Sequence, residues 1–232
     1  MFFKKKYVIL FFAVLFIFII ATCFWIKYKE PEFKGRGYCA ITNEYEKPVF
    51  YDDFISNEEA DHIIQLATPL FSESKLVSGG TENVRKSETA WLPKNDATVQ
   101  KIIEKVCDLT NIPFDRSEKM QVVKYQPGGF YNPHYDASCD DKKECVEFEQ
   151  NGGQRVVTLI IYLNSDFTGG TTYFPNLKKE YIPKKLSALL FYSLEKNGNK
   201  CHPLSLHAGM PVKTGEKYIA NVWLRENTYQ IP

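Results

Sequence analysis

The sequence predicts an α+β domain in which two helices pack on one face of an antiparallel β-barrel or jelly roll. Two segments with helical periodicity come first, and a run of short strands separated by turn residues follows. Helices that precede the strands, rather than alternating with them, are typical of this layered arrangement. A length of 232 residues, of which 44% are hydrophobic and 15% aromatic, suffices for one such domain and excludes a disordered chain.

An apolar segment comes before the domain. Residues 7–26 contain no charged side chain. A helix of that length, rising about 1.5 Å per residue, spans a hydrocarbon core of about 30 Å. Three lysines at positions 4–6 precede the segment, which favours a cytoplasmic N-terminus. We therefore expect a transmembrane signal-anchor, and a signal peptide cleaved near Cys23 is the alternative.

The predicted anchor divides the chain into three parts. Residues 1–26 would form a cytoplasmic tip and the transmembrane helix, 27–47 a polar stem, and 48–232 the folded domain. This organisation predicts a single-pass type II membrane protein whose domain faces the lumen of the endoplasmic reticulum or Golgi. Disulfides are permitted there, but an odd number of cysteines follows the anchor, so their pairing stays open. These cysteines are Cys39, Cys107, Cys139, Cys145 and Cys201.

The charge balance limits the possible partners. The chain has 29 basic and 28 acidic side chains, which gives a formal net charge of +1. Binding to phosphate backbones requires a basic excess. We therefore expect no nucleic-acid partner.

Both predicted helices show an apolar stripe. The first begins at Ser56, which has capping-box spacing with Glu59, and its stripe consists of Ala60, Ile63, Ile64 and Ala67. The second runs over 96–109, with a stripe of Val99, Ile102, Ile103 and Val106, and ends before Pro113. The residues between the two helices, 72–87, contain serine and glycine and predict a loop.

Five strands are predicted after residue 120, because β-branched and aromatic residues gather there in short runs. Glycine-containing turn sequences, such as those at 127–129 and 151–153, separate the runs. The predicted strands are 121–125, 156–163, 171–174, 186–192 and 217–225.

The histidines suggest a metal site. His134 and Asp136 form the one His-x-Asp sequence in the chain, and residues i and i+2 of an extended strand point to the same face. With one distant histidine they would form a 2-His-1-carboxylate site of the kind that binds Fe(II). The third ligand would be His62, His202 or His207, although the helical position of His62 favours a packed or surface role.

The last predicted strand has one apolar face and one mixed face. Tyr218, Ala220, Val222 and Leu224 form the apolar face, which we expect to face the core. Lys217, Ile219, Asn221, Trp223 and Arg225 form the other face. Together with the histidine and aspartate above, this second face predicts a site lining in which Lys217 binds the far carboxylate of a dicarboxylate.

A series of ordered motifs resembles the prolyl 4-hydroxylase family of 2-oxoglutarate- and Fe(II)-dependent dioxygenases, which includes the collagen-type and the plant and algal enzymes. The resemblance covers about residues 48–226. Its motifs are VRKSETAWL (84–92), LT (109–110), MQVVKYQPGGFYNPHYD (120–136), NGGQR (151–155), GGTTYFP (169–175), HAGMPV (207–212) and Lys217.

The resemblance implies a double-stranded β-helix (jelly roll) core and assigns roles to individual residues. It implies that His134, Asp136 and His207 hold Fe(II), and that Lys217, with Tyr125 and Thr172, binds the cosubstrate 2-oxoglutarate. It further implies that Tyr131, Arg155 and Trp223 lie near the peptide substrate. The implied reaction is hydroxylation of a peptidyl proline at C4, with L-ascorbate keeping the iron reduced and a proline-rich peptide or protein as substrate.

The chain departs from the family pattern at two places. Relatives often have Gly-Asp where this chain has Leu186-Ser187, so the turn there is expected to differ. Relatives commonly have histidine at the position of Arg225, which puts peptide contacts in doubt. The partner subunit of the animal collagen enzymes has no counterpart, and we expect a monomer or homo-oligomer.

Two other functions fit the same sequence. The same iron chemistry on another side chain, such as lysine, would use the same barrel. A catalytically silent binding module would keep the fold, although the complete ligand set and Lys217 disfavour it. A structural zinc site is disfavoured too, because such sites usually have four ligands.

Overall fold

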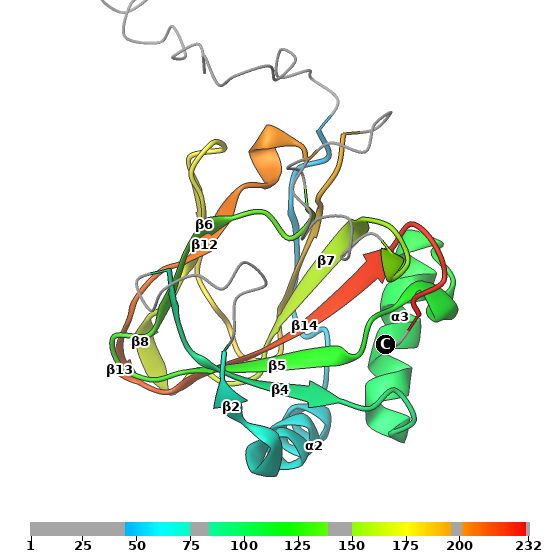
Figure 1. Ribbon diagram of the computed structural model, residues 1–232. Coiled ribbons are helices and arrows are strands. Elements are labelled where there is room, and N and C mark those ends of the chain that lie inside the picture. The colour runs from blue at the N-terminus through cyan, green and yellow to red at the C-terminus, as the bar shows by residue number, and fades with distance from the viewer. Residues whose placement is uncertain (1–44, 75–83, 139–149, 196–200, 231–232) are drawn as a thin grey trace, which may run out of the picture. The chain divides into compact units, whose positions relative to one another are not determined.

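The computed structural model describes residues 45–74, 84–138, 150–195 and 201–230 (Figure 1). The predicted signal-anchor lies outside the described residues, as does nearly all of the stem. In the described part of the chain, no helix is long and apolar enough to cross a membrane.

Two antiparallel sheets and a strand pair form the β core, which agrees with the predicted jelly roll. The larger sheet has the order β1 (Val49–Tyr51), β11 (Ala188–Tyr192), β7 (Arg155–Tyr162), β14 (Lys217–Arg225), β5 (Met120–Tyr125), β4 (Glu88–Leu92) and β2 (Ser72–Glu73). The smaller sheet has the order β10 (Lys179–Tyr181), β9 (Thr172–Phe174), β12 (His207–Gly209), β6 (Phe130–His134) and β3 (Arg85–Lys86). The separate pair is β13 (Val212–Gly215) with β8 (Phe167–Gly169).

The two predicted helices are both present. Helix α2 (Asn57–Ala67) begins with the expected capping box between Ser56 and Glu59. Helix α3 (Ala97–Thr110) is capped by Asp96, whose side chain accepts hydrogen bonds from two backbone N–H groups, and it ends at Asn111 in the left-handed conformation. The described residues also contain three short 3-10 helices: Thr68–Leu70, Phe114–Arg116 and Pro203–Ser205.

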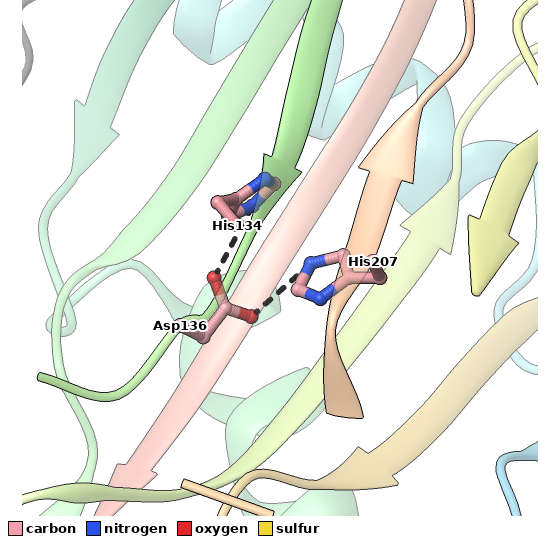
Figure 2. A group of neighbouring side chains, drawn as sticks. All are labelled: His134, Asp136 and His207. Carbon is pink, nitrogen blue, oxygen red and sulfur yellow. Dashed lines mark ion pairs between the residues drawn. The ribbon is translucent and has the colours of Figure 1, made fainter. Parts of the chain in front are cut away.

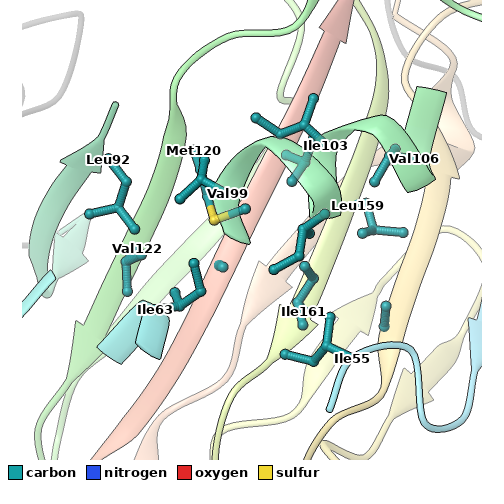
Figure 3. Close-up of a cluster of buried hydrophobic side chains, with 14 of the residues drawn as sticks. Ile55, Ile63, Leu92, Val99, Ile103, Val106, Met120, Val122, Leu159 and Ile161 are labelled. Atoms are coloured by element: carbon teal, nitrogen blue, oxygen red, sulfur yellow. The ribbon is translucent and has the colours of Figure 1, made fainter. Parts of the chain in front are cut away.

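One apolar cluster joins the two helices to the larger sheet (Figure 3). Ile63 of α2 and Val99, Ile103 and Val106 of α3 are fully buried against strand residues such as Leu159. The apolar face predicted for the last strand lies in this layer, since Ala220, Val222 and Leu224 belong to the same cluster. The helices therefore cover one face of the larger sheet, as the sequence predicted.

A second apolar cluster contains residues of both sheets. Its buried members from the larger sheet include Val123, Ile160 and Ile219, and Phe174 belongs to the smaller sheet. The other face of the larger sheet therefore faces the interior of the β core. Strand β14 separates the two layers: its apolar face contacts the helices, and its mixed face points into the core, where the candidate site lies.

The five predicted strands match β5, β7, β9, β11 and β14; the bounds of β14 are as predicted, and no end of the others differs by more than two residues. The other strands were not predicted. Several have only two or three residues, such as β3 and β8, and a run that short shows no recognisable alternation. Two of the short unpredicted strands, β2 and β3, lie within the expected 72–87 loop, whose residues 75–83 lie outside the described part.

Leu186 adopts a backbone φ of 69°. This left-handed conformation favours glycine, because a Cβ atom clashes with the following carbonyl group. It is the position at which the sequence departs from the glycine of the family pattern. The backbone carbonyl of Leu186 accepts hydrogen bonds from the N–H groups of Phe54 and Ile55, which hold the turn.

Two cysteines belong to the described residues. Cys107 is a buried free thiol on α3, whereas Cys201 is disulfide-bonded. The other three cysteines of the predicted domain and stem, Cys39, Cys139 and Cys145, lie outside the described residues.

Candidate active site

Three predicted ligands meet inside the smaller sheet (Figure 2). His134 is the last residue of β6 and His207 the first of β12, and the two are direct partners in the antiparallel register. Asp136 lies two residues beyond the end of β6 rather than within it. The ligand atoms of all three side chains lie within 4.8 Å of one another. The structure therefore brings the predicted residues together, and of the three candidate histidines His207 is the one that joins the cluster.

Hydrogen bonds fix the orientation of both imidazoles. Nδ1 of His134 lies 2.8 Å from the carbonyl oxygen of Asn132, and Nδ1 of His207 lies 2.9 Å from that of Ser205. A carbonyl oxygen only accepts, so each ring has its proton on Nδ1 and the lone pair of Nε2 available. Both Nε2 atoms point towards the carboxylate of Asp136. This is the arrangement by which proteins orient metal-binding histidines.

The carboxylate of Asp136 is also held in place. Its Oδ2 accepts a hydrogen bond of 2.7 Å from the hydroxyl group of Thr158 on β7. Burial alone would raise the pKa of Asp136, but the neighbouring His207, His134 and Arg155 outweigh burial and lower it to about 2. Burial and the proximity of His207 lower the pKa of His134 to about 3. At neutral pH the aspartate is therefore charged and this histidine neutral, which are the forms that bind a metal ion.

The donor set fits a divalent iron ion. Nε2 of His134 lies 3.7 Å from Oδ1 of Asp136, and Nε2 of His207 lies 3.7 Å from Oδ2. These distances are too long for hydrogen bonds. The three ligand atoms therefore face one another without hydrogen bonds between them. Non-haem Fe(II) oxygenases typically bind the metal ion through two imidazoles and one carboxylate on one side. The coordination positions on the other side stay open.

Lys217 is the buried cation that the sequence predicted. Its side chain is 2% exposed, and its ammonium group donates a hydrogen bond of 2.6 Å to the carbonyl oxygen of Gly170. Burial lowers its pKa to about 7. No acidic side chain of the described residues forms a salt bridge with it, so the site fits a carboxylate supplied by a ligand.

Aromatic rings surround this ammonium group. Nζ of Lys217 lies 5.4 Å from the ring centre of Tyr125 and 5.6 Å from that of Tyr162. The hydroxyl groups of Tyr162 and Thr172 lie 2.8 Å apart and form a buried hydrogen bond. Tyr125 and Thr172, both predicted, therefore belong to the buried surroundings of Lys217, and Tyr162 is an addition that the sequence analysis missed.

Tyr131 covers one of the histidine ligands. Its ring stacks on that of His134 with the centres 3.5 Å apart, and the guanidinium group of Arg85 lies 4.7 Å from the centre of the tyrosine ring. Burial raises the pKa of Tyr131, so its hydroxyl group is protonated and can donate a hydrogen bond. The structure thus places Tyr131 against the ligand cluster, and its role near the peptide substrate stays a prediction.

Arg155 and Trp223 meet on the other side of the cluster. The guanidinium carbon of Arg155 lies 3.6 Å from the centre of the Trp223 ring, and its Nη1 donates to the carbonyl oxygen of Asp136 at 3.4 Å. Glu118 binds Arg155 through both carboxylate oxygens, at 2.5 and 2.8 Å. The same Glu118 accepts a hydrogen bond of 2.8 Å from Nε of Arg225.

The second departure from the family pattern is explained by these contacts. Arg225 is 3% exposed, and in addition to Glu118 it binds the carbonyl oxygen of Gly153 at 2.6 Å. Its guanidinium group therefore stabilises the interior of the domain and supports Arg155 through the shared carboxylate.

The remaining histidines lie apart from the cluster. His62 bonds to Asp96 at the N-terminus of α3, and His202 stacks on the ring of Tyr45. The site residues that the sequence analysis missed are Thr158, Tyr162, Glu118 and Arg85. No local sequence pattern identifies these four residues, because each contacts a residue that is distant in the sequence.

Comparisons with known proteins agree with this site. The family model of the 2OG-Fe(II) oxygenase superfamily matches residues 120–225. "Putative prolyl 4-hydroxylase" of Acanthamoeba polyphaga mimivirus is 46% identical over 193 residues, which span 83% of this chain and 80% of that protein. Prolyl 4-hydroxylase 5 of Arabidopsis thaliana is 32% identical over 227 residues, spanning 87% of this chain and 76% of that protein.

A solved structure shows the same fold. The viral collagen prolyl hydroxylase of Paramecium bursaria chlorella virus-1, in complex with 2-oxoglutarate, superimposes with a TM-score of 0.60 at 33% identity. The match covers 77% of this chain and 95% of that chain. The residues matched by the family model, 120–225, include the three ligands and Lys217.

Proposed function

The chain belongs to the prolyl 4-hydroxylase family of 2-oxoglutarate- and Fe(II)-dependent oxygenases, and on this premise we propose that it hydroxylates a peptidyl proline at C4. It is a dioxygenase that uses Fe(II) and 2-oxoglutarate. The single observation that supports this most strongly is the group of His134, Asp136 and His207, whose ligand atoms lie within 4.8 Å of one another in a family member. Loss of these three ligands would be expected in the alternative function, a catalytically silent binding module with this fold.

The three ligands would hold the iron on one side and leave its other side for the reactants. When bound, iron would supply the activation of O2, the oxidant: one oxygen atom would go to 2-oxoglutarate, which gives succinate and CO2, and the other would enter the C4–H bond of the proline. The residues of this chain supply position, charge and exclusion of water. L-ascorbate is the reductant that keeps the iron ferrous.

Lys217 binds the far carboxylate of 2-oxoglutarate in this proposal. The ammonium group is buried between Tyr125 and Tyr162, and a carboxylate there would provide the counter-charge that it lacks among the described residues. An ion pair out of contact with water is strong enough to orient the cosubstrate. Thr172 and Tyr162 form the adjoining polar wall through their shared hydrogen bond.

Tyr131, Arg155 and Trp223 bind the peptide beside the metal. Tyr131 stacks on one ligand, and Arg155 bonds to the backbone of another, so a peptide in contact with them lies next to the reacting centre. A proline-rich peptide in the polyproline II conformation suits this position, because its rings and carbonyl groups point outwards and it has little conformational freedom to lose.

The test uses the protein with Fe(II), 2-oxoglutarate, ascorbate and synthetic peptides of the (Pro-Pro-Gly) type or of the plant-wall type. Mass spectrometry would locate one added oxygen at C4 of proline, with succinate formed in equal amount. His134→Ala and Asp136→Ala should abolish both products. His62→Ala is the matched control, because this histidine lies on helix α2 away from the cluster.

Two results would contradict the proposal. If the added oxygen were found on lysine and not on proline, the enzyme would be a lysyl hydroxylase with the same iron chemistry. Succinate formation unaffected by loss of either ligand would refute the iron site.

We also propose that residues 7–26 anchor the protein in a membrane, with the domain on the lumenal side of the endoplasmic reticulum or Golgi. The support is the uncharged apolar run and the three lysines before it. Expression of the full chain in a secretory cell should give a protein that resists alkaline extraction and is protected from added protease. Extraction into the soluble fraction would contradict the anchor.

A further inference from the structure

Trp91 on strand β4 is an exposed aromatic side chain next to the site. Six large hydrophobic side chains of the described residues are exposed, and Trp91, at 44%, is the one aromatic residue among them. Single exposed hydrophobic side chains are common and need no function. Trp91 differs from the other five because of what its ring contacts.

The indole ring of Trp91 continues a stack that begins at the metal ligands. Its centre lies 6.0 Å from that of Trp223, and the two rings are tilted by 42°. Arg155 lies on the ring of Trp223 at 3.6 Å and bonds to the backbone of Asp136. Asp136, Arg155, Trp223 and Trp91 therefore form an unbroken series of contacts from the ligand cluster to the surface.

The strand pattern places Trp91 on the site side of the sheet. Its neighbours Ala90 and Leu92 are buried in the cluster under the helices, so Trp91 points to the opposite face. In the register of the sheet Trp91 pairs with Gln121, which in turn pairs with Asn221 of β14. Trp91 thus shares the face that contains the mixed residues of β14, although helices cover the other face of the same strand.

An unused hydrogen-bond donor lies at the centre of this series. Nε1 of Trp223 is buried and has no acceptor among the described residues. A buried donor without a partner is costly, and an acceptor from a bound peptide would satisfy it. The backbone carbonyl groups of a polyproline II helix have no internal partners and are therefore suitable acceptors.

We propose that Trp91 binds a second proline of the substrate, about one turn of polyproline II away from the proline that reacts. The inference rests on the proposed function, because it takes a proline-rich peptide as the substrate. Aromatic side chains are the usual docking surface for proline rings. In polyproline II, residues three apart lie on the same side and about 9 Å from each other, so the proline one turn from the reacting residue is the one proposed to contact Trp91.

The test compares Trp91→Ala with wild type on matched peptides that contain no aromatic residue. One peptide has a reactive proline and further prolines three residues before and after it, and in two others one of these flanking prolines is alanine. Wild-type KM should rise about fivefold when the contacting proline is replaced, as expected for loss of one aromatic contact. Trp91→Ala should show the raised KM with every peptide, because the contact is already lost. Trp91→Phe should restore much of the difference in KM between the peptides.

Three controls separate the possible outcomes. Ile182→Ala removes another exposed side chain, 75% exposed, and should leave KM and kcat unchanged. The thermal unfolding midpoint and the iron affinity of Trp91→Ala should match wild type, which excludes a folding defect. Quenching of tryptophan fluorescence by the peptide, measured without turnover, should weaken in Trp91→Ala.

The outcomes distinguish this inference from the proposed function. If wild type hydroxylates proline but Trp91→Ala keeps the same KM and the same peptide preference, the role of Trp91 is refuted and the function stands. If wild type neither binds nor hydroxylates these peptides, the proposed function fails and the inference fails with it. A loss confined to kcat or to iron binding would also overturn the docking role.

Discussion

The hydroxyl group of Thr158 donates a hydrogen bond of 2.7 Å to Oδ2 of Asp136. Thr158 lies on the larger sheet and Asp136 follows the last residue of a strand in the smaller one. The bond therefore connects the two sheets at the metal site. It also leaves Oδ1 of the carboxylate on the side of His134.

Thr158→Val should weaken iron binding. Losing a partner that orients a ligand typically costs about 10- to 100-fold in metal affinity or activity. Titration of the metal-free protein with Fe(II) under anaerobic conditions measures the affinity, and Thr158→Ser should retain it. Thr168→Val is the control, because that hydroxyl group bonds to Thr214 at an exposed site. Unchanged affinity in Thr158→Val would show that the bond has no orienting role.

The affinity for 2-oxoglutarate should fall as pH rises above neutrality. Burial lowers the pKa of free Lys217 to about 7, and a bound carboxylate favours the charged ammonium group, so the pKa in the complex is higher. Between these two pKa values binding takes up a proton, and KM for 2-oxoglutarate should rise by about tenfold per pH unit. Initial rates between pH 6 and about 9 measure this slope. A KM that is constant over this range would contradict the proposed ion pair.

Glu118→Gln should destabilise the fold. It leaves the buried guanidinium group of Arg225 and the largely buried one of Arg155 without their shared carboxylate, and breaking a buried ion pair costs about 3–5 kcal/mol. Urea unfolding measures the free energy of unfolding. Asp52→Asn is the matched control, because its bond to Lys184 lies between two exposed side chains and is expected to contribute at most about 1 kcal/mol.

The same carboxylate predicts sensitivity to acid. Burial alone would raise the pKa of Glu118, but Arg155 and Arg225 outweigh burial and keep it below its usual value. The stabilising contribution of Glu118 is complete above its pKa in the unfolded chain, about 4.3. It is lost as pH falls through its lower pKa in the folded protein. Glu118→Gln should therefore lose less stability than wild type when pH is lowered below about 4. An identical loss in both proteins would contradict this contribution.

Leu159→Ala should destabilise the layer between the helices and the larger sheet. Leu159 is fully buried in that cluster, and removing such a side chain costs about 2–5 kcal/mol because a cavity remains. Leu109→Ala on α3 is the control, since its side chain is 47% exposed and the expected change is within about 0.5 kcal/mol. Equal effects in the two variants would show that the layer does not contribute as described.

Local patterns in the sequence were enough to predict the parts of the site that depend on periodicity. The spacing of His134 and Asp136 indicated the cluster, although Asp136 lies two residues beyond the end of β6 and not on the strand assumed for it. The alternation of β14 places Lys217 and Trp223 on one face, so their positions followed from the geometry of a strand. The helices were predicted for the same reason, since the stripe at Val99, Ile102 and Ile103 repeats with the turn of the helix.

The supporting residues could not be predicted in this way. Glu118 binds Arg155, 37 residues later, and Arg225, 107 residues later, so its role exists only once the sheets have formed. Thr158 looks like any other residue of a buried strand until Asp136 is placed opposite it. Trp91 was part of a family motif, but its contact with Trp223 depends on the order of three strands, which the sequence does not show.

The pairing of His134 with His207 across β6 and β12 has a consequence for how the protein tolerates insertions. The distance between the two imidazoles is determined by the hydrogen-bonded ladder and not by the chain that connects them. Loops between these strands can change in length without altering the ligand geometry. Adding or deleting a single residue within either strand would turn one imidazole to the opposite side of the sheet, and one such event would eliminate catalysis without changing any residue that contacts iron.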